Sequence, residues 1–237
     1  IDFKGIKLAK CIRYNEMYDI NWTLNEINES GAGLVICHHL NDCIKYKKMK
    51  IPNVKFTYVG HCADNSIFKN YNLDKIYDIT FVGIDNSSVY PLRNRLKNIA
   101  FEIKNMYNIH FHPHPGYNLT DAYTDKYLIE MAKVINQSKI IISCSSKYKY
   151  RLGKYIEVPM SHSVLCADIP NDDDNYDYLI DIHNDMSDEN IIDKLSYYLN
   201  NSDALGHKQI RGIEFSQYYT QPLYAERLLN KFLEFIN

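Results

Sequence analysis

The sequence lacks the features that mark membrane, disulfide-framework and nucleic-acid-binding proteins. Its longest apolar stretches, such as KIIIS at 139–143, are far shorter than the roughly 20 residues of a membrane-spanning helix, and we expect no transmembrane segment, signal peptide or anchor. The six cysteines are scattered without a CxxC pair, which favours reduced thiols and a cytoplasmic location. A net charge of -2 gives no electrostatic field that would gather nucleic acid.

What the sequence does have is an alternation of short apolar runs with helical patterns, almost from end to end. This order is typical of a parallel sheet with crossover helices. We predict strands at 7–12, 33–38, 54–59, 78–83, 108–112, 139–143, 163–167 and 178–182. We predict helices at 22–29, 41–49, 89–106, 124–137, 188–200 and 222–236.

A domain boundary is predicted near residues 60–75, where a strand runs into the Gly-, Asn- and Asp-rich segment GHCADNSIFKNYNLDK. We therefore expect a partial N-terminal lobe at 1–64 and a larger domain at 65–237, with a cleft between them. The last helix either crosses back to the first lobe or forms an oligomer contact. Because the first lobe has about three predicted strands, it is either truncated or docks on another domain of a larger polypeptide.

The stretch 139–170 holds the most informative pattern of polar residues. A buried strand ends in Ser143–Ser146, a basic loop follows, and a short helix that starts near Gly153 carries Glu157. In open α/β sheets, ligands bind outside the carboxyl ends of the strands, where backbone N–H groups bind anions. A glutamate one turn into such a helix can accept hydrogen bonds from two ribose hydroxyls. The alternative is a solvated basic loop with a surface glutamate.

Four segments follow one another in an order that is known from one protein family. They are VGHCADNSIFKNY, YDITFVGIDNSSVYPLRNRL, IHFHPHPGY and GKYIEVPMSHSVLCADIP. Together they resemble GT-B glycosyltransferases of the glycosyltransferase-group-1 type, including the spore-maturation-like members, across roughly residues 52–235. The resemblance implies an α/β, GT-B-like fold: a Rossmann-type parallel sheet flanked by helices, with a small partial N-terminal α/β lobe. It also implies that the lobe at 1–64 is the acceptor side and that 65–237 is the nucleotide-sugar (donor) binding domain.

The resemblance also implies roles for individual residues. Glu157 matches the glutamate that binds the nucleotide ribose, and Lys154 with Arg151 match basic positions that face the diphosphate. Gly83 matches the glycine that lets the backbone approach the donor. Arg93 is a further candidate for a phosphate contact, unless it is simply solvated. The remaining residues expected at the donor site are His112, His114, Ser145, Tyr155, Ser161 and His162.

Two positions depart from the family pattern. Retaining members carry a second glutamate eight positions before the ribose glutamate, and this sequence has Lys149 there. The stereochemistry of transfer is therefore left open. A glycine common after the short helix is replaced by His162, which either contacts a phosphate or fills space.

Two other patterns invite a metal interpretation. His110, His112 and His114 alternate, so they point to one face of an extended segment, and imidazole suits zinc. No carboxylate can be assigned beside them, and a donor-phosphate or acceptor contact is preferred to a metal site, with a purely structural role as the alternative. The run Asp172–Asp174 is interpreted as a solvated loop. We expect no metal and no other cofactor.

The predicted function is transfer of a sugar from a nucleotide-sugar, which is a substrate, to an unidentified glycan, protein or lipid. A catalytically inactive nucleotide-sugar-binding module and a sugar-nucleotide epimerase remain as alternatives. An inverting transferase also needs a general base for the acceptor hydroxyl, commonly supplied by the first lobe of this fold. Weak candidates near its strand ends are Glu16, Asp19, His38 and His39, each with a structural or solvated alternative.

Overall fold

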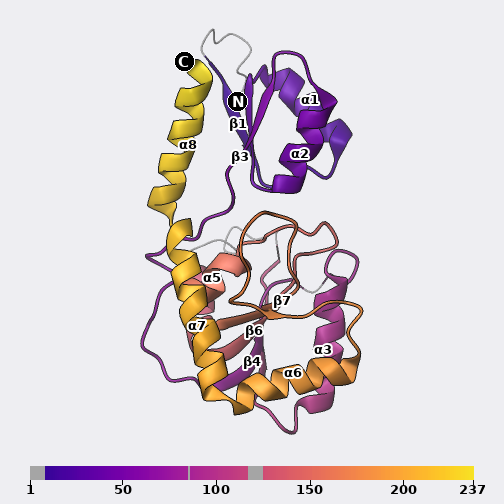
Figure 1. Ribbon diagram of the computed structural model, residues 1–237, viewed down its shortest axis with the longest axis vertical. Coiled ribbons are helices and arrows are strands. Elements are labelled where there is room, and N and C mark those ends of the chain that lie inside the picture. The colour runs from indigo at the N-terminus through magenta and orange to yellow at the C-terminus, as the bar shows by residue number, and fades with distance from the viewer. Residues whose placement is uncertain (1–8, 85, 117–124) are drawn as a thin grey trace. The chain divides into compact units, whose positions relative to one another are not determined.

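The computed structural model describes residues 9–84, 86–116 and 125–237. These residues form two compact units, each with its own parallel sheet (Figure 1). Unit 1 comprises Ile1–His61 and Gln221–Asn237, and unit 2 comprises Cys62–Thr220. The division therefore falls between residues 61 and 62, where the sequence indicated 64 and 65, and the last helix belongs to unit 1.

The sheet of unit 1 has three parallel strands in the order β1-β2-β3. The strands are β1 (Cys11–Tyr14), β2 (Leu34–Cys37) and β3 (Lys55–Tyr58), joined by the helices α1 (Ile20–Ser30) and α2 (Leu40–Met49). Side chains from all five elements share one core cluster, made up of Tyr14, Met17, Ile27, Val35, Cys37, Cys43, Tyr46 and Phe56. Each connection is thus a strand, a crossover helix and a parallel strand, as the sequence pattern predicted.

The C-terminal helix α8 (Gln221–Ile236) completes unit 1. Gly33, just before β2, allows its close approach, because a Cβ there would lie 2.8 Å from Cζ of Phe235. At the other end of α8, the buried Tyr224 hydroxyl lies 2.5 Å from Nε2 of His38 and accepts a hydrogen bond from Arg13 at 3.3 Å. In the structure this helix therefore belongs to unit 1.

Unit 2 has a five-stranded parallel sheet in the order β5-β4-β6-β7-β8. Its strands are β4 (Tyr77–Phe81), β5 (Ile109–Phe111), β6 (Ser138–Ile142), β7 (Val164–Ala167) and β8 (Ile180–Asp181). Its helices are α3 (Pro91–Ile103), α4 (Asp125–Asn136), α5 (Lys154–Met160), α6 (Asp188–Asn200) and α7 (Ser202–Ser216), followed by the 3-10 turn η2 (Gln217–Tyr219).

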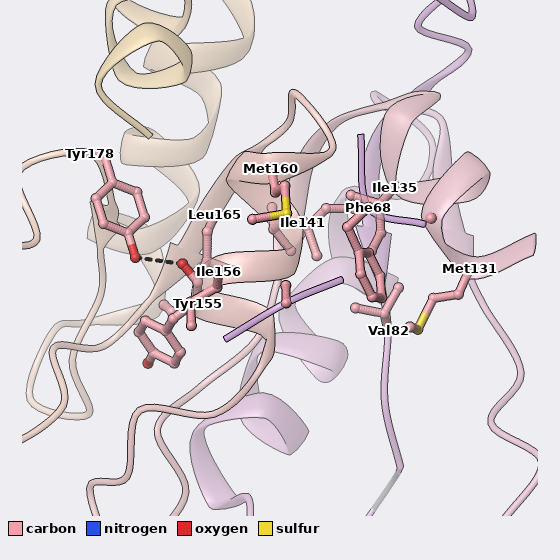
Figure 2. Packing of buried hydrophobic residues seen from close by; sticks show 14 of the residues in the cluster. Phe68, Val82, Met131, Ile135, Ile141, Tyr155, Ile156, Met160, Leu165 and Tyr178 are labelled. Carbon is pink, nitrogen blue, oxygen red and sulfur yellow. Dashed lines mark hydrogen bonds between the residues drawn. The ribbon is translucent and has the colours of Figure 1, made fainter. Parts of the chain in front are cut away.

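Helices cover both faces of this sheet, because side chains of the central strands alternate between two cores. Ile140 and Ile142 of β6 pack in a cluster with residues of α3 and α6. Ile141 lies in the opposite cluster, with residues of α4 and α5 (Figure 2). Figure 2 also shows the Tyr178 hydroxyl, which donates a hydrogen bond to the carbonyl of Tyr155 at 2.8 Å. The result is a doubly wound, Rossmann-type unit, which confirms the predicted fold class.

The chain reverses its direction of travel across the sheet between β4 and β6. From β4 it moves outward to β5, returns past β4 to β6, and then continues to β7 and β8. Neighbouring strands whose connections leave in opposite directions open a crevice at their carboxyl ends, the usual ligand position in such sheets. In unit 2 the corresponding position is between the segments after Phe81 and Ile142, which are paired in the sheet register.

Most predicted elements are present, with one omission. The helix α7 was not predicted, because its sequence SDALGHKQIRGIEFS contains two glycines and few large apolar residues. Its start signal was present: the Asn201 side chain accepts a hydrogen bond from the Ala204 N–H at 3.0 Å. Strand β8 is shorter than the predicted 178–182, and α3 ends at Ile103 where the sequence indicated 106.

Candidate functional site

Arg93 spans the carboxyl ends of β4 and β6. It stands in the first turn of α3, and its guanidinium donates one hydrogen bond to the Ile84 carbonyl at 3.0 Å and another to the Ser143 hydroxyl at 3.2 Å. The guanidinium also lies 4.3 Å from the ring centre of Tyr90. Arg93 is only 7 % exposed, so it is not the solvated surface residue that was the alternative interpretation. It is a fixed cation at the switch point of the sheet, which is the place between β4 and β6 where the chain reverses its direction across the sheet.

Gly83 makes this arrangement possible. Its φ is +101°, a backbone conformation that residues with a side chain rarely adopt. A Cβ at this position would lie 2.8 Å from Nη1 of Arg93. The glycine therefore serves both the turn and the close approach of the arginine.

Beside Arg93 lies a hollow of about 370 Å³ at the carboxyl ends of β4 and β5. Its lining includes Gly83, Arg93, Lys97, His112 and His114. Nε of Arg93 and Nε2 of His112 are buried, and neither has a hydrogen-bond partner among the described residues. Because buried polar atoms are normally paired, two such residues side by side in the lining of one hollow indicate a place for a ligand.

The histidines of this hollow are held in the neutral form. Burial lowers the pKa of His112, and the neighbouring His110 lowers it further. Burial also lowers the pKa of His114, and the positive charges of Lys154 and Arg93 add to that effect. Their imidazoles can therefore donate or accept hydrogen bonds at neutral pH, while the positive charge of the site comes from lysine and arginine.

Lys154 and Glu157 lie together in the first turn of α5. The ammonium group of Lys154 forms an ion pair with the Glu157 carboxylate, and both side chains remain 17 % exposed. Oε1 of Glu157 lies only 2.5 Å from the point where a Cβ on Gly153 would stand. The glycine thus allows the carboxylate to fold back over the start of its own helix.

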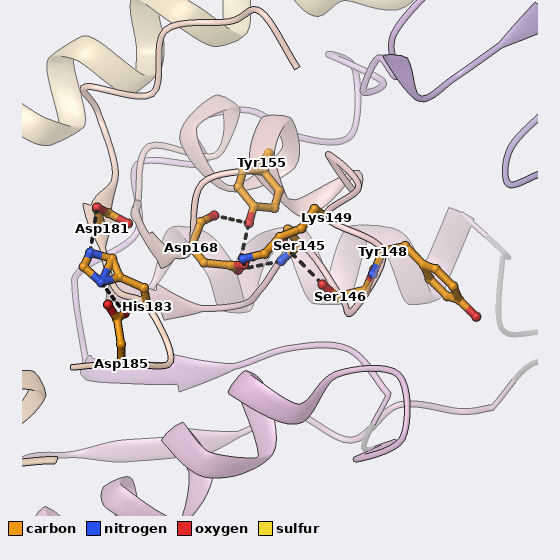
Figure 3. Close-up of polar contacts among 9 residues, drawn as sticks. All are labelled: Ser145, Ser146, Tyr148, Lys149, Tyr155, Asp168, Asp181, His183 and Asp185. Atoms are coloured by element: carbon orange, nitrogen blue, oxygen red, sulfur yellow. Dashed lines mark hydrogen bonds and ion pairs between the residues drawn. The ribbon is translucent and has the colours of Figure 1, made fainter. Parts of the chain in front are cut away.

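Ser145 belongs to a polar cluster that shapes the loop after β6 (Figure 3). Its N–H and hydroxyl both donate to the buried carboxylate of Asp168, at 2.8 and 2.5 Å. Lys149 forms an ion pair with the same carboxylate at 2.6 Å. Ser146 and Lys149 have φ values of 65° and 56°, and such strained backbone tends to occur at functional sites.

Arg151 does not line the hollow and is held by ion pairs instead. Its side chain is buried and forms ion pairs with Asp172, at 3.5 Å, and with Asp174, and its guanidinium lies 4.3 Å from the ring centre of Tyr219. Its charge is already neutralised by these carboxylates. The interpretation of 172–174 as a solvated loop is therefore wrong for Asp172 and Asp174 and holds for the exposed Asp173.

Three further predicted donor residues lie away from the hollow. Tyr155 is completely buried, and its hydroxyl donates to the Asp168 carbonyl at 2.6 Å. Ser161 and His162 follow the end of α5 and precede β7, so they lie at the amino edge of the parallel sheet. The His162 carbonyl there accepts a hydrogen bond from Lys75 at 2.7 Å. We correct the assignment of Ser161 and His162, because the candidate site is at the opposite edge.

The candidate bases of the first lobe fall in two places. Glu16 and Asp19 lie between β1 and α1, where Asp19 caps the helix by accepting a hydrogen bond from the Trp22 N–H at 3.0 Å. His38 and His39 follow β2 and are buried. The ring of His38 lies 4.4 Å from that of His61. None of the four is tied to a catalytic role by these contacts.

Two residues of the site were missed by sequence reasoning. Lys97 lines the hollow one helical turn beyond Arg93, and its spacing of four residues was the available signal. Asp168 organises the loop after β6, and its place directly after the buried strand VLCA was a signal of the same kind. Lys97 was passed over because its helix was interpreted through its apolar face, and Asp168 because the segment before it was interpreted through its basic residues.

Within residues 9–84, 86–116 and 125–237, no group of three or more His, Cys, Asp or Glu side chains is arranged to hold a metal ion. None of the helices described has the length and apolar composition needed to cross a bilayer.

Comparison with known proteins supports the fold. No protein-family model matches the sequence, and no curated protein matches it. Sucrose-phosphate synthase from Thermosynechococcus elongatus matches with a TM-score of 0.67 and 8 % identity, over 98 % of this chain and 69 % of that one. A variant of TarM from S. aureus, in complex with fondaparinux, alpha-GlcNAc-glycerol and UDP, matches with a TM-score of 0.61 and 15 % identity, over 94 % and 50 %.

A third match is the pneumococcal O-GlcNAc transferase GtfA in complex with UDP and GlcNAc. Its TM-score is 0.58 at 11 % identity, over 94 % of this chain and 48 % of that one. The chain thus spans about half the length of TarM and GtfA. The two parallel α/β units, the helix that returns to the first unit and these matches establish that the chain has the GT-B glycosyltransferase fold.

Proposed function

We propose that the chain is a glycosyltransferase that takes a sugar from a nucleoside-diphosphate sugar bound at the carboxyl edge of the unit 2 sheet. The observation that carries the proposal is a hollow lined by two residues, Arg93 and His112, that each have a buried nitrogen without a hydrogen-bond partner among the described residues. A polar, anionic ligand would satisfy both.

The charges around the hollow suit a diphosphate. Arg93 and Lys97 line it, and the charge of Lys154 is close enough to lower the pKa of both His112 and His114. We assign the phosphate contacts to Arg93 and Lys154 and give Arg151 a structural role, because its guanidinium is already paired with Asp172 and Asp174. With these cations at the site, we propose that transfer needs no divalent ion.

Glu157 is proposed to bind the ribose. Its carboxylate is partly exposed, and it lies one helical turn from Gly153. A carboxylate with two acceptor oxygens can receive hydrogen bonds from both hydroxyls of one ribose. The Lys154 ammonium that now neutralises Glu157 would move onto the phosphate when the nucleotide enters.

The proposed role of the cations in the reaction follows from the charge of the leaving group. As the bond to the sugar breaks, negative charge gathers on the leaving diphosphate, and cations fixed in advance stabilise that charge without reorganisation. Removing one such donor typically costs about 3 kcal/mol of transition-state stabilisation. Arg93 fits this role best, because two protein hydrogen bonds and a ring contact hold its guanidinium in place.

The structural neighbours guide the choice of substrate. TarM and GtfA were determined with UDP, GtfA is an O-GlcNAc transferase and a third neighbour is a synthase, which does not favour epimerisation or binding without turnover. UDP is therefore the first nucleotide to test, and the acceptor is left open. A cytoplasmic location, expected from free cysteines such as Cys144 and Cys166, is part of the same proposal.

Calorimetric titration of the full chain with UDP, GDP, CDP and ADP tests the proposal. We expect one nucleoside diphosphate to bind, and Glu157→Ala to weaken that binding at least about tenfold, which corresponds to about 1.4 kcal/mol. Glu102→Ala is the matched control, because Glu102 is an exposed glutamate on α3 and away from the hollow. If no diphosphate binds, or if the two variants behave alike, the donor-site proposal is wrong.

A further inference from the structure

Unit 1 contains a hollow at the amino edge of its sheet, where α2 ends and β3 begins. Its volume is about 300 Å³. We name it the lysine hollow and define it by its lining residues, Tyr46, Lys47, Lys50, Ile51, Val54, Lys55 and Phe56. Ligands of open α/β sheets bind at the opposite, carboxyl edge of the strands. The lysine hollow is therefore a separate place on the molecule, and its own residues must indicate what it binds.

All charges that line the lysine hollow are positive. They belong to Lys47, Lys50 and Lys55, and the sequence has no aspartate or glutamate between positions 43 and 63. Among the described residues, no carboxylate lies within ion-pair distance of these three ammonium groups. Lysines without counter-charges attract anions locally, although the whole chain has a net charge of -2.

The floor of the lysine hollow is apolar and belongs to the core of unit 1. Tyr46 and Phe56 are buried, and their rings stack with the centres 5.6 Å apart. Ile51 and Val54 are partly buried and pack against the same core cluster. A concave surface with an apolar lining and a few charged groups is the usual form of a small-molecule site. A ligand that fits this hollow therefore has both an apolar face and a negative charge.

Helix stability explains only one of the three lysines. Lys47 stands in the last turn of α2, where a cation interacts favourably with the helix dipole. Lys50 follows the helix with a φ of +51°, a position at which glycine or asparagine is normally preferred. Lys55 begins β3, and its ammonium lies 5.5 Å from the ring centre of Phe235. A lysine in strained backbone at Lys50 favours a functional role, because such strain tends to occur at functional sites.

We infer that the lysine hollow binds a phosphate monoester with an apolar substituent, whose phosphate contacts the three lysines and whose substituent packs on Ile51 and Val54. A phosphate monoester carries about two negative charges near neutral pH and offers several acceptor oxygens to the ammonium groups. Free organic phosphates have this chemistry, and so does the headgroup of phosphatidate in a membrane. The inference does not depend on the proposed function, because the hollow beside Arg93 lies in unit 2.

Two binding experiments on the full chain distinguish the two sources of such a phosphate. Calorimetric titration with naphthyl phosphate tests for a free ligand, with inorganic phosphate as the comparison that lacks an apolar part. Co-sedimentation with vesicles of phosphatidylcholine and phosphatidate tests for a lipid, with phosphatidylcholine vesicles as the comparison. We expect binding in at least one experiment and weaker binding of its comparison. If neither probe binds more tightly than its comparison, the inference is wrong.

Lys50→Gly separates binding from folding. The glycine removes one charge and also relieves the positive φ, so binding of the responding probe should weaken about fivefold while the melting temperature stays the same or rises. Lys55→Gln should weaken binding by a similar factor. Lys104→Gln is the matched control, because Lys104 is an exposed lysine at the end of α3 in unit 2. Unchanged binding in both hollow variants, or an equal loss in all three, contradicts the inference.

The two proposals fail separately. Nucleoside-diphosphate titration of Lys50→Gly is expected to match that of the unaltered chain, because the two hollows lie in different units. Probe binding that Lys50→Gly weakens supports the lysine hollow whether or not a nucleotide binds. Naphthyl phosphate that displaces the nucleotide and binds Lys50→Gly as well as the unaltered chain occupies the hollow beside Arg93, and this result removes the inference while the proposed function stands.

Discussion

Gly153 and Glu157 illustrate how one missing side chain positions a functional group. The φ of Gly153 is -51°, which any residue can adopt, so only the folded-back carboxylate of Glu157 requires a glycine there. Gly83 differs, since both its positive φ and the nearby Arg93 exclude a side chain. The two glycines therefore predict different consequences of substitution.

Gly153→Ala is expected to weaken nucleoside-diphosphate binding with little effect on stability. The added methyl group meets the end of a flexible glutamate, which can rotate away, so the melting temperature changes little while the carboxylate leaves its position. Calorimetry with the nucleotide that binds and a thermal unfolding curve measure the two effects. Unchanged affinity would show that the folded-back position of Glu157 has no role in binding.

Neutral histidines predict that unit 2 loses stability as the pH falls. Burial lowers the pKa of His110 in the folded state, whereas an exposed histidine in the unfolded chain titrates near about 6.5. Below that pH the unfolded chain binds more protons than the folded one, so the free energy of unfolding decreases on acidification from about pH 7 to pH 5.5. His110→Phe keeps the stacking on Tyr77 and should flatten this dependence in denaturant titrations. An unchanged slope contradicts this explanation.

For single residues, the sequence predicted which edge of the sheet they occupy better than it predicted which side chains they contact. Gly83, Lys154 and Glu157 lie at the expected edge of the sheet, because their positions follow from strand ends and helix starts. The phosphate contact expected of Arg151 is now proposed for Arg93, because two carboxylates already pair with Arg151. Those carboxylates lie 21 and 23 positions further along the chain. Which arginine is neutralised depends on that tertiary pairing, and local sequence carries no signal for it.

Among the secondary-structure elements, α7 shows why apolar periodicity was insufficient. Large apolar runs identified the buried strands, but α7 packs through a glycine: a Cβ on Gly212 would lie 2.9 Å from Cβ of Pro159 in α5 and 3.4 Å from the ring of Tyr178. A helix that packs through its backbone has few large residues on its contact face. The pattern that predicts helices is therefore weakest for this one.

Replacing either glycine of α7 by alanine is expected to change the stability of the chain, in opposite directions for the two positions. Gly206→Ala meets no atom within 4 Å and should stabilise the chain by about 0.5–1 kcal/mol, because alanine loses less backbone entropy in a helix. Gly212→Ala pushes α7 away from α5, because the added methyl group would lie too close to Pro159. This variant should destabilise the chain by about 1–3 kcal/mol. Urea unfolding of both variants compares them directly. Equal effects would show that the close approach of α7 and α5 is not maintained in solution.

At the scale of the whole molecule, the chain leaves unit 1 at His61 and returns to it at Gln221. The sequence predicted the two units and both parallel sheets, since strand and helix order determines them. It left the role of the last helix open, because the apolar face of α8 has the same pattern whether it meets its own unit or another copy. In the structure α8 belongs to unit 1, where Phe235 lies against Gly33 and Tyr224 against His38.

Truncation before Gln221 is expected to destabilise unit 1 selectively. It removes the Phe235 ring from Gly33 and the Tyr224 hydroxyl from His38 and Arg13, while the core clusters of unit 2 contain no residue of α8. Hydrogen exchange should accelerate in β1, β2 and β3 and remain slow in β6 and β7, which serve as the internal control. Uniform acceleration would mean that the two units do not unfold separately.

On the proposed function, a nucleoside diphosphate lies at the carboxyl edge of the unit 2 sheet, in the hollow beside Arg93. A crystal structure of the full chain with the diphosphate that binds tests it most directly. We expect ribose hydroxyls within hydrogen-bond distance of the Glu157 carboxylate and phosphate oxygens on the Arg93 guanidinium and the Lys154 ammonium. A nucleotide bound elsewhere, with the Lys154–Glu157 ion pair intact and the hollow beside Arg93 unchanged, would contradict it.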